Sequence, residues 1–336
     1  MRKGIAVAGN ILLDRIKVVD SYPEKGLLVK IRELENAIGG CVCNTGTDLC
    51  VIDPSLRVSG YGKVGRDGEG AFLKRKLAEV GMDVSHIGEC DVPTTFSDVM
   101  TVAATGERTF FTFTGADATL GIADIDPAAL DCEIFHIGYI LLLDALDAPD
   151  AEYGTVMARL LAGIQRAGVK TSVDVISEDS ERFREKVIPA LKYCDYAVLN
   201  EIESGRVAGI PPRDGEGRLI PENMEKICEA FFEMGVRECV VVHCPEAGFA
   251  RNARGEFFAV PSLDLPKDYI KGAVGAGDAF CAGALYSFWR GDGEEEMLRF
   301  ASACAAGNLS AKDSVSGMRS YEEIKGLESR FGRKSL

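Results

Sequence analysis

Short apolar segments alternate with longer amphipathic segments along most of the chain. The apolar segments have the length and the β-branched content of buried strands, and the amphipathic segments repeat apolar residues every three or four positions, as helices do. The predicted strands are residues 4–9, 132–138, 170–175, 194–200 and 238–244. The predicted helices are residues 68–81, 152–168 and 222–235. This alternation predicts an α/β fold with a mainly parallel sheet and helices on both faces.

Two stretches, residues 15–38 and 92–113, depart from this alternation. In both, apolar and polar residues alternate, and Val, Ile, Thr and Phe are frequent. This pattern is typical of short antiparallel strands. Both stretches adjoin glycine-rich loops, which favours a small β lid over a cleft, whereas an edge hairpin without a ligand is the alternative. Because no internal repeat or linker is visible, residues 1–336 are expected to form a single domain carrying this lid.

The sequence KGAVGAGDAF, residues 271–280, places three glycines directly before an apolar helical pattern. Glycine costs conformational entropy, so such a cluster indicates a tight turn or a close approach of the backbone to another group. The loop would deliver the amides of Gly275, Ala276 and Gly277 to the N-terminus of a helix. Free amides and the positive end of the helix dipole together favour an anion, so we expect an anion site here.

Asp278 follows this glycine cluster at the junction with the helix. A carboxylate beside a bound phosphate repels it unless the carboxylate has another task, and taking a proton from an attacking hydroxyl is such a task. Phosphoryl transfer otherwise needs positioning and charge neutralisation. The pattern therefore indicates a general base, with a simple N-cap as the alternative.

A second group of polar residues lies near the N-terminus. Asp14 follows the first predicted strand, and Gly39, Gly40 and Asn44 lie at the start of another predicted helix. Loops at the carboxyl ends of strands form the ligand crevice of an open α/β sheet. Asp and Asn side chains there can accept from and donate to sugar hydroxyls, while ordinary loop and cap contacts are the alternative.

Asn200 and Glu203 emerge together at the end of the strand predicted around residues 195–199. If a helical turn follows, side chains three residues apart face the same way. Their hard oxygen atoms suit Mg²⁺, often through water. The same spacing also describes an N-cap with its capping-box glutamate, and this alternative stays open.

The early GG…N, the middle NxxE and the late GAGDAF occur in an order that resembles the ribokinase/phosphofructokinase-B family of carbohydrate kinases. The resemblance covers nearly the whole chain. It implies a ribokinase-like fold and a kinase reaction that uses ATP and Mg²⁺. It implies that Asp278 is the catalytic base, with Gly275, Ala276 and Gly277 as the anion hole, and that the sugar is bound by Asp14, Gly39, Gly40 and Asn44.

The resemblance also implies a nucleotide site. Asn200 and Glu203 would organise Mg²⁺ and phosphate, with Glu203 acting on the metal through water. The segment VVVHCPEAGFA, taken as one strand, would border the nucleotide with His243 and Gly248, and Ser302 is assigned to the same site. The chain departs from the family at His243, where a Thr is common, and at Gly272, where an Asp usually opens the late motif.

Composition and charge restrict the choice of partners. The formal net charge of −14 argues against nucleic acid or an anionic membrane as a partner. Eleven cysteines in an irregular arrangement indicate reduced thiols in the cytoplasm. The pair Cys41 and Cys43 lacks a second ligand pair for a metal, and three widely separated histidines are expected to be structural.

These observations predict an ATP-dependent sugar kinase that phosphorylates a hydroxymethyl group. A nucleoside kinase remains open because Phe96, Phe111 and Phe113 lie in the predicted lid, and a sugar-phosphate kinase would need basic residues such as Arg108, Lys30 or Arg32. A non-catalytic sugar- or nucleotide-binding regulator is a further alternative. A dinucleotide-dependent dehydrogenase is disfavoured because the first strand leads into AGNILLD rather than G-x-G-x-x-G. An exposed lid edge could also pair two copies into a homodimer.

Overall fold

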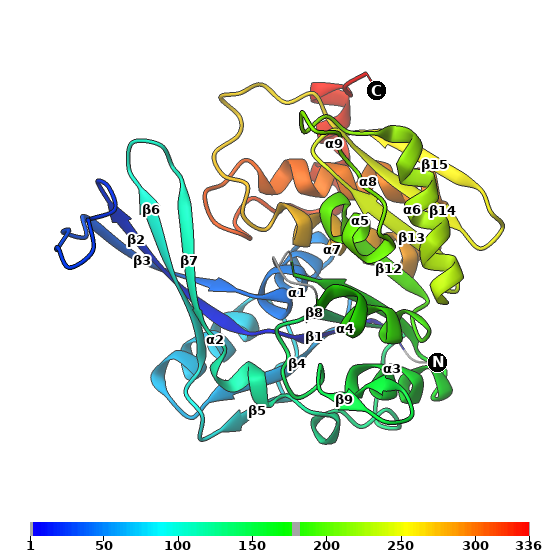
Figure 1. The fold of residues 1–336 in the computed structure, drawn as a ribbon, viewed down its shortest axis with the longest axis horizontal. Coiled ribbons are helices and arrows are strands. Elements are labelled where there is room, and N and C mark those ends of the chain that lie inside the picture. Colours follow the sequence, from blue (N-terminus) through cyan, green and yellow to red (C-terminus); the bar gives the residue numbers. More distant parts are fainter. Residues whose placement is uncertain (1–2, 177–181, 336) are drawn as a thin grey trace.

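We describe a computed structural model of the protein, covering residues 3–176 and 182–335. Its centre is a nine-stranded sheet in the order β15-β14-β13-β12-β11-β8-β1-β4-β5 (Figure 1). All pairs from β13 to β5 are parallel. The strands are β1 (Ile5–Gly9), β4 (Val58–Gly65), β5 (Ile87–Cys90), β8 (Ile134–Ile140), β11 (Lys170–Val175), β12 (Tyr196–Asn200), β13 (Cys239–His243), β14 (Ala247–Asn252) and β15 (Phe257–Pro261). The predicted mainly parallel sheet is confirmed.

The edge beyond β13 differs from the sequence prediction. The segment VVVHCPEAGFA is not one strand, because the chain reverses between His243 and Ala247 and returns as β14. β13 pairs with β14, and β14 with β15, in antiparallel register, so that His243 lies opposite Gly248. The apolar run continues through the turn, so its hydrophobic pattern alone did not mark the reversal.

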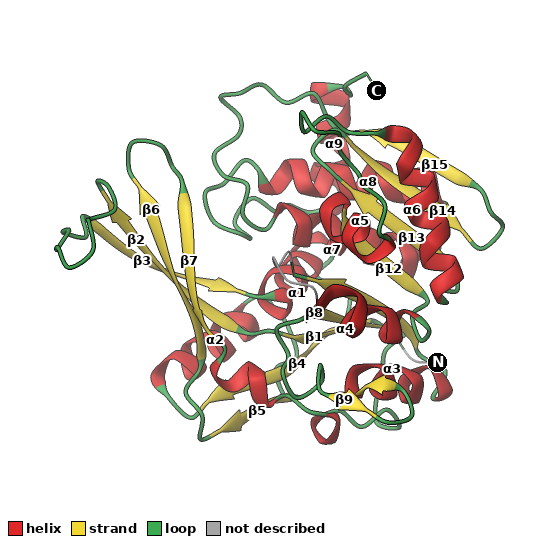
Figure 2. Cartoon of the chain, viewed as in Figure 1, coloured by secondary structure: helices red, strands yellow, loops and turns green. Residues whose placement is uncertain are grey.

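Helices cover both faces of the sheet (Figure 2). Because side chains alternate along a strand, Ile5 and Val7 of β1 belong to one hydrophobic cluster and Ala6 and Ala8 to the other. On the first face lie α1 (Cys41–Ile52), α2 (Gly68–Glu79), α7 (Ala276–Arg290), α8 (Glu294–Asn308) and α9 (Tyr321–Phe331). On the second face lie α3 (Val156–Arg166), α4 (Arg182–Leu191), α5 (Glu201–Ala208) and α6 (Pro221–Met234).

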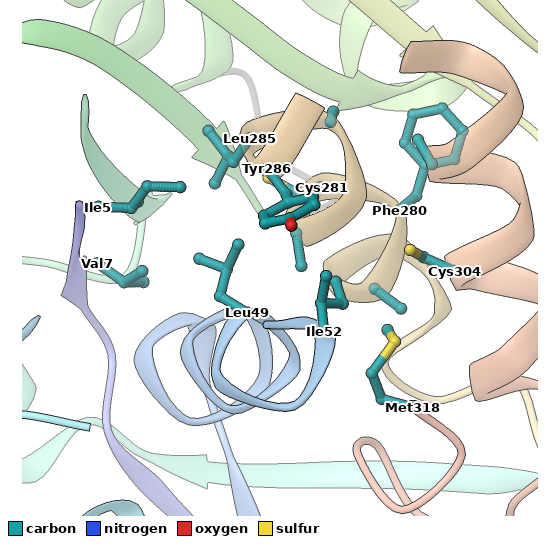
Figure 3. Packing of buried hydrophobic residues seen from close by; sticks show 14 of the residues in the cluster. Ile5, Val7, Leu49, Ile52, Phe280, Cys281, Leu285, Tyr286, Cys304 and Met318 are labelled. Atoms are coloured by element: carbon teal, nitrogen blue, oxygen red, sulfur yellow. The ribbon is translucent and has the colours of Figure 1, made fainter. Parts of the chain in front are cut away.

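The first cluster fixes the helices that carry the candidate site. Figure 3 shows Ile5 and Val7 of β1 facing Leu49 of α1, with Leu285 of α7 close to them. All four side chains are fully buried. Each buried aliphatic side chain stabilises the fold by about 1.5–3 kcal/mol. This packing holds the N-termini of α1 and α7 near each other, so that Asn44 of α1 reaches Asp278 of α7.

A second, four-stranded sheet projects from the main body, as Figure 1 shows. Its order is β3-β2-β6-β7, with β2 (Leu12–Val19), β3 (Glu33–Gly39), β6 (Thr95–Val102) and β7 (Arg108–Phe113). The two predicted antiparallel hairpins, β2–β3 and β6–β7, are present, and their strands fall within or close to residues 15–38 and 92–113. The inner strands β2 and β6 pair in parallel, because both hairpins leave the body in the same direction.

The remaining elements are short. They are the 3₁₀ turns η1 (Gly115–Thr119) and η2 (Ile122–Asp124) and the two-residue strands β9 (Pro149–Asp150) and β10 (Gly154–Thr155). Within residues 3–176 and 182–335, every helix is too short or too polar to cross a lipid bilayer.

Candidate active site

The predicted glycine loop leads into the N-terminus of α7. Gly275 is the N-cap, and its left-handed backbone (φ 79°) favours glycine. A Cβ atom there would lie 2.4 Å from the Ser314 carbonyl oxygen, so a side chain would also collide with the neighbouring loop. Ala276 and Gly277 are the first residues of the helix, whose first amides have no partner within the helix. The arrangement can hold an anion at this helix end.

Asp278 lies in the first turn of α7, but Gly275 is the N-cap, so the N-cap alternative for Asp278 is wrong. Its carboxylate is 9% exposed. It accepts hydrogen bonds from Tyr139 Oη (2.5 Å), Asn44 Nδ2 (3.0 Å) and Thr45 Oγ1 (3.5 Å). Burial raises the pKa of Asp278, and the three donors oppose this rise without cancelling it. A carboxylate with a raised pKa is a stronger base, which suits proton abstraction.

Asn44 comes from the first turn of α1, which begins after Gly40. Gly40 has φ 89°, and a Cβ atom there would lie 2.6 Å from the Asn10 carbonyl oxygen. The Asn44 amide nitrogen donates to Asp278, and its oxygen accepts from Ser314 Oγ at 2.8 Å. Asn44 therefore links α1, α7 and the loop after α8. Its contact with a sugar stays a prediction.

Asp14 lies on β2, in the four-stranded sheet that corresponds to the predicted lid. It lines a pocket together with Ile16, Ala37, Val99, Arg108, Phe110, Val274, Lys312, Asp313 and Ser314. Burial raises the pKa of Asp14 to about 7, Arg108 lowers it and Asp278 raises it. Asp14 is thus close enough to Arg108 and to Asp278 to interact electrostatically with each. A Cβ atom on Gly39 would lie 2.6 Å from Asp14 Oδ2, so the absence of a side chain there makes room for this carboxylate.

Asn200 and Glu203 form a reciprocal capping box at the start of α5. Asn200 Oδ1 accepts from the Glu203 amide (2.8 Å), and Glu203 Oε2 accepts from the Asn200 amide (3.1 Å). The capping box, which was the alternative to a metal site, is therefore present. Glu203 is nevertheless 5% exposed and, together with Asp278, raises the pKa of Asp174, after burial as the main cause. Three interacting carboxylates of this kind are a donor set that suits Mg²⁺.

His243 ends β13 beside the α7 N-terminus. Its ring stacks on Phe280 with 4.8 Å between centroids, and a Cβ atom on Gly277 would lie 3.3 Å from His243 Cε1. Burial lowers the pKa of His243 to about 4, so the imidazole is neutral at pH 7. Gly248 lies opposite His243, and a Cβ atom there would lie 3.1 Å from Phe280 Cζ.

Ser302 lies one helix further away, on α8. Its hydroxyl donates to the Arg299 carbonyl oxygen (3.0 Å) and accepts from Arg333 Nη1 (2.9 Å). Within residues 3–176 and 182–335, no hydrogen bond joins Ser302 to another predicted site residue. Its place in a nucleotide site stays a prediction.

Sequence reasoning missed several residues that the fold brings to the site. Tyr139 follows a predicted strand, and Asp174 lies within another, so the carboxyl end of each strand was the available signal. Thr45 and Ser314 give no comparable signal. Asp117 lies at the other side of Asn10, accepting from its amide nitrogen at 3.1 Å and from the Ile11 backbone amide at 3.2 Å.

Comparison with solved structures supports the assignment of the fold. The Arabidopsis thaliana ribokinase, solved in complex with ribose and ATP, superposes with a TM-score of 0.77 at 19% sequence identity. The match covers 97% of this chain and 99% of that chain. This likeness defines the fold as ribokinase-like, a parallel α/β body with a small β sheet over the ends of its strands.

The chain belongs to the pfkB family of carbohydrate kinases, because the family's sequence profile matches residues 2–319. Among curated relatives, the ribokinase of Arabidopsis thaliana is 24% identical over 329 residues, covering 95% of this chain and 79% of the relative. An ATP-dependent ribose-1-phosphate kinase of Halopiger xanaduensis is 24% identical over 301 residues, covering 89% of each chain. The predicted family and the predicted carbohydrate kinase activity are confirmed.

Proposed function

We propose that this carbohydrate kinase transfers the γ-phosphoryl group of ATP to a hydroxymethyl group of a sugar or sugar-like acceptor, with Asp278 as the general base. The observation that carries the proposal is the place of Asp278. It is a buried carboxylate with a raised pKa, in the first turn of α7, at the positive end of that helix. The family membership of the chain supports the same reaction.

In the proposed step, Asp278 takes the proton of the acceptor hydroxyl. The acceptor oxygen forms a bond to the γ-phosphorus, the bond from that phosphorus to the β–γ bridging oxygen breaks, and ADP leaves with the electron pair. The amides of Ala276 and Gly277, at the positive end of the α7 dipole, would stabilise the negative charge on the transferring group. Gly275 would shape the loop that exposes them.

The acceptor and the nucleotide would enter from opposite sides of Asp278. Asp14, Gly39, Gly40 and Asn44 would form the sugar site under the lid, since Asp14 and Asn44 both border Asp278. His243 and Gly248 would border the nucleotide, since His243 lies against Gly277. Asn200 and Ser302 would complete that side. Closure of the lid would exclude water and suppress ATP hydrolysis.

Mg²⁺ is part of this proposal, and the carboxylates of Glu203 and Asp174 fit it. Both are buried acids, and Asp174 interacts with Glu203 and with Asp278. Each would act on the metal, Glu203 through water. The bound metal would neutralise charge on the nucleotide phosphates.

We also propose that residues 1–336 act as a single kinase domain in the cytoplasm and that the lid can join two copies. The eleven cysteines are all unpaired, which agrees with a reducing compartment. Leu34, Phe111 and Phe113 are 68%, 57% and 43% exposed, and the strand register places them on the lid face opposite the pocket. Exposed apolar groups on a sheet with two open edges favour self-association.

The proposal is tested by measuring ATP consumption with free pentoses, hexoses, nucleosides, polyols and sugar phosphates. We expect at least one acceptor to raise ADP release well above the rate without acceptor, and chelation of divalent metal to abolish the gain. The Asp278→Asn variant is the control for contaminating kinases. ADP release that no acceptor stimulates, from protein that still binds a nucleotide, would indicate the regulator alternative.

A further inference from the structure

The pocket beneath the lid contains a cation that pairs with no carboxylate of the described residues. Arg108, at the start of β7, lines this pocket, and in the described part of the chain no carboxylate oxygen lies within 4 Å of its guanidinium. Its hydrogen bond among the described residues is long, 3.5 Å from Nη2 to the Lys312 carbonyl oxygen. Three other lid cations are paired: Arg15 with Glu69, Lys17 with Asp98 and Arg32 with Asp20.

The strand register places Arg108 on the lid face that looks into the pocket. Asp14 lies opposite Ser97, and Thr101 lies opposite Arg108, so all four side chains point to one side of the sheet. β7 is the lid strand beside the loop after α8, as Figure 1 shows. Lys312, on that loop, lines the same pocket. Lys312 is exposed and its carbonyl oxygen accepts from Arg108, so a second basic residue borders the pocket.

A chain of hydrogen bonds connects this pocket to Asp278. Asp14 and Arg108 line the pocket together with Ser314. The Ser314 hydroxyl donates to Asn44, and the Asn44 amide nitrogen donates to Asp278. An acceptor that presents one hydroxyl to Asp278 and another to Asp14 would therefore lie in the pocket that Arg108 lines. The walls there are apolar, formed by Ile16, Val99 and Phe110, and an apolar wall strengthens an ion pair.

Among the described residues, the acidic groups in the pocket form no ion pair with Arg108. Burial alone would raise the pKa of Asp313, but hydrogen bonds from the Ser316 hydroxyl and from the amides of Val315 and Ser316 lower it, so the charged carboxylate is held by its own loop. Asp14 is largely desolvated, with its pKa raised to about 7. In a chain with a net charge of −14, a guanidinium that pairs with no carboxylate of the described residues favours an anionic ligand at this place.

We propose that the acceptor is a sugar derivative that carries an anionic group, a phosphate or a carboxylate, and that Arg108 binds this group with help from Lys312. The proposal rests on the kinase function proposed above and specifies the substrate class of the same site. A guanidinium matches both anions, because its planar donors bind two oxygens at once. Of the three basic residues that the sequence suggested, only Arg108 lines the pocket; Arg32 is paired with Asp20 and 61% exposed, and Lys30 is exposed.

The test compares matched acceptors with the full chain. Three pairs separate the anion from the sugar: ribose 1-phosphate with ribose, fructose 6-phosphate with fructose, and gluconate with glucitol. We expect the anionic member of at least one pair to have a kcat/KM at least about tenfold higher than its neutral partner, as one charge-assisted contact provides. The pair that responds tells phosphate from carboxylate.

Arg108→Gln should reduce this anionic-to-neutral ratio by about tenfold or more, mainly through the acceptor KM, while the ATP KM stays close to its original value. Arg108→Lys should restore part of the ratio, since it keeps the charge but loses the two-pronged contact. Arg32→Gln, at the paired lid cation, is the matched control and should leave the ratio unchanged.

A second measurement applies if the protein phosphorylates none of these acceptors. Thermal shifts of the Asp278→Asn variant should then show stabilisation by an anionic member and not by its neutral partner, and Arg108→Gln should remove the difference. Equal turnover and equal stabilisation by both members of every pair would overturn the anionic-acceptor proposal while leaving the kinase function intact. Acceptor-independent ADP release would instead count against the kinase function.

Discussion

At the scale of single residues, the properties of Asp278 are set by side chains distant in the sequence. Tyr139 comes from β8, and Asn44 and Thr45 come from α1, so each donor lies more than 130 positions away. The motif identified the carboxylate, because a glycine-rich loop before a helix is a local pattern. It did not identify the donors, because their hydrogen bonds form only when the sheet brings β8, α1 and α7 together.

The first prediction replaces Asp278 by Asn. The amide keeps the size of the side chain but cannot take a proton, so turnover should fall by roughly two to four powers of ten while nucleotide binding changes little. Steady-state kinetics and a nucleotide titration measure the two effects. Asp91→Asn, at a carboxylate that is 89% exposed, is the matched control. Near-normal turnover of Asp278→Asn would leave that residue with a structural role only.

The second prediction concerns Asp14, the lid carboxylate of the pocket. Asp14→Ala removes a hydrogen-bonding group from the acceptor side, so the acceptor KM should rise about ten- to a hundredfold and the ATP KM much less. Asp98→Ala is the matched control, because Asp98 lies on the opposite face of the same lid and pairs with Lys17. An equal rise in both KM values would indicate that the lid itself is disturbed.

At the scale of elements, one motif can satisfy a helix and a metal site at once. The capping box of Asn200 and Glu203 explains their spacing without any ligand. The sequence could not separate the two interpretations, because both require the same residues three positions apart. The metal-site interpretation rests on the burial of Glu203 and on the rise in the pKa of Asp174 that Glu203 contributes. Both depend on β11 lying next to β12.

The third prediction separates the two roles of Glu203. A glutamine keeps the capping hydrogen bond through its amide oxygen but removes the charge, so Glu203→Gln should leave the melting temperature nearly unchanged. The Mg²⁺ concentration needed for half-maximal activity should rise about 10- to 100-fold. Glu203→Ala, which loses the cap as well, should also lower the melting temperature. If Glu203→Gln has an unaltered Mg²⁺ requirement, Glu203 is a helix cap alone.

The fourth prediction concerns monovalent cations at the loop before α7, where Gly272 stands in the place of the Asp that usually opens the late motif. Gly272 supplies no carboxylate, and a Cβ atom there would lie 2.8 Å from the Ala311 and 3.0 Å from the Lys312 carbonyl oxygen. The adjacent Lys271 does not reach this site, because its Nζ donates to the Asp268 carbonyl oxygen at 2.5 Å. The Lys312 oxygen already accepts from Arg108.

Because position 272 supplies no carboxylate, turnover should change little when potassium chloride is replaced by choline chloride at constant ionic strength. The measurement is the initial rate across a series of cation ratios, with Mg²⁺ and ATP held saturating. Saturable activation by potassium would show that other carbonyl oxygens form the site without a carboxylate.

At the scale of the whole molecule, the order of strands and helices was predictable and the packing of the site was not. Alternating buried strands and amphipathic helices predicted the parallel sheet, because covering both faces of such a sheet requires that pattern. The alternation of apolar and polar residues at successive positions predicted the lid hairpins, because one face of each hairpin is solvated. The antiparallel edge of β13 to β15 was missed, since the buried run continues through the turn at residues 244–246.

The last prediction concerns acid stability. His136 lies in the centre of β8, fully buried, with Nδ1 3.0 Å from Ser172 Oγ. Burial lowers the pKa of His136 to about 3, whereas the unfolded chain binds this proton near pH 6.5. Since the unfolded state binds more protons between these values, His136 makes the fold lose stability as the pH falls from about 6.5 toward 3, by about 1.4 kcal/mol per pH unit within the window.

Buried carboxyls act in the opposite direction, because burial raises the pKa of Asp117 to about 8 and of Asp147 to about 6. The total pH dependence therefore mixes both effects, and a variant is needed to isolate one. His136→Asn should destabilise the protein at pH 7 through lost packing, and this deficit should shrink by about 1.4 kcal/mol per unit between pH 6 and 4. Urea unfolding at each pH measures it, with the exposed His86→Asn as control. A deficit independent of pH would mean that His136 takes up its proton in the folded state as readily as in the unfolded chain.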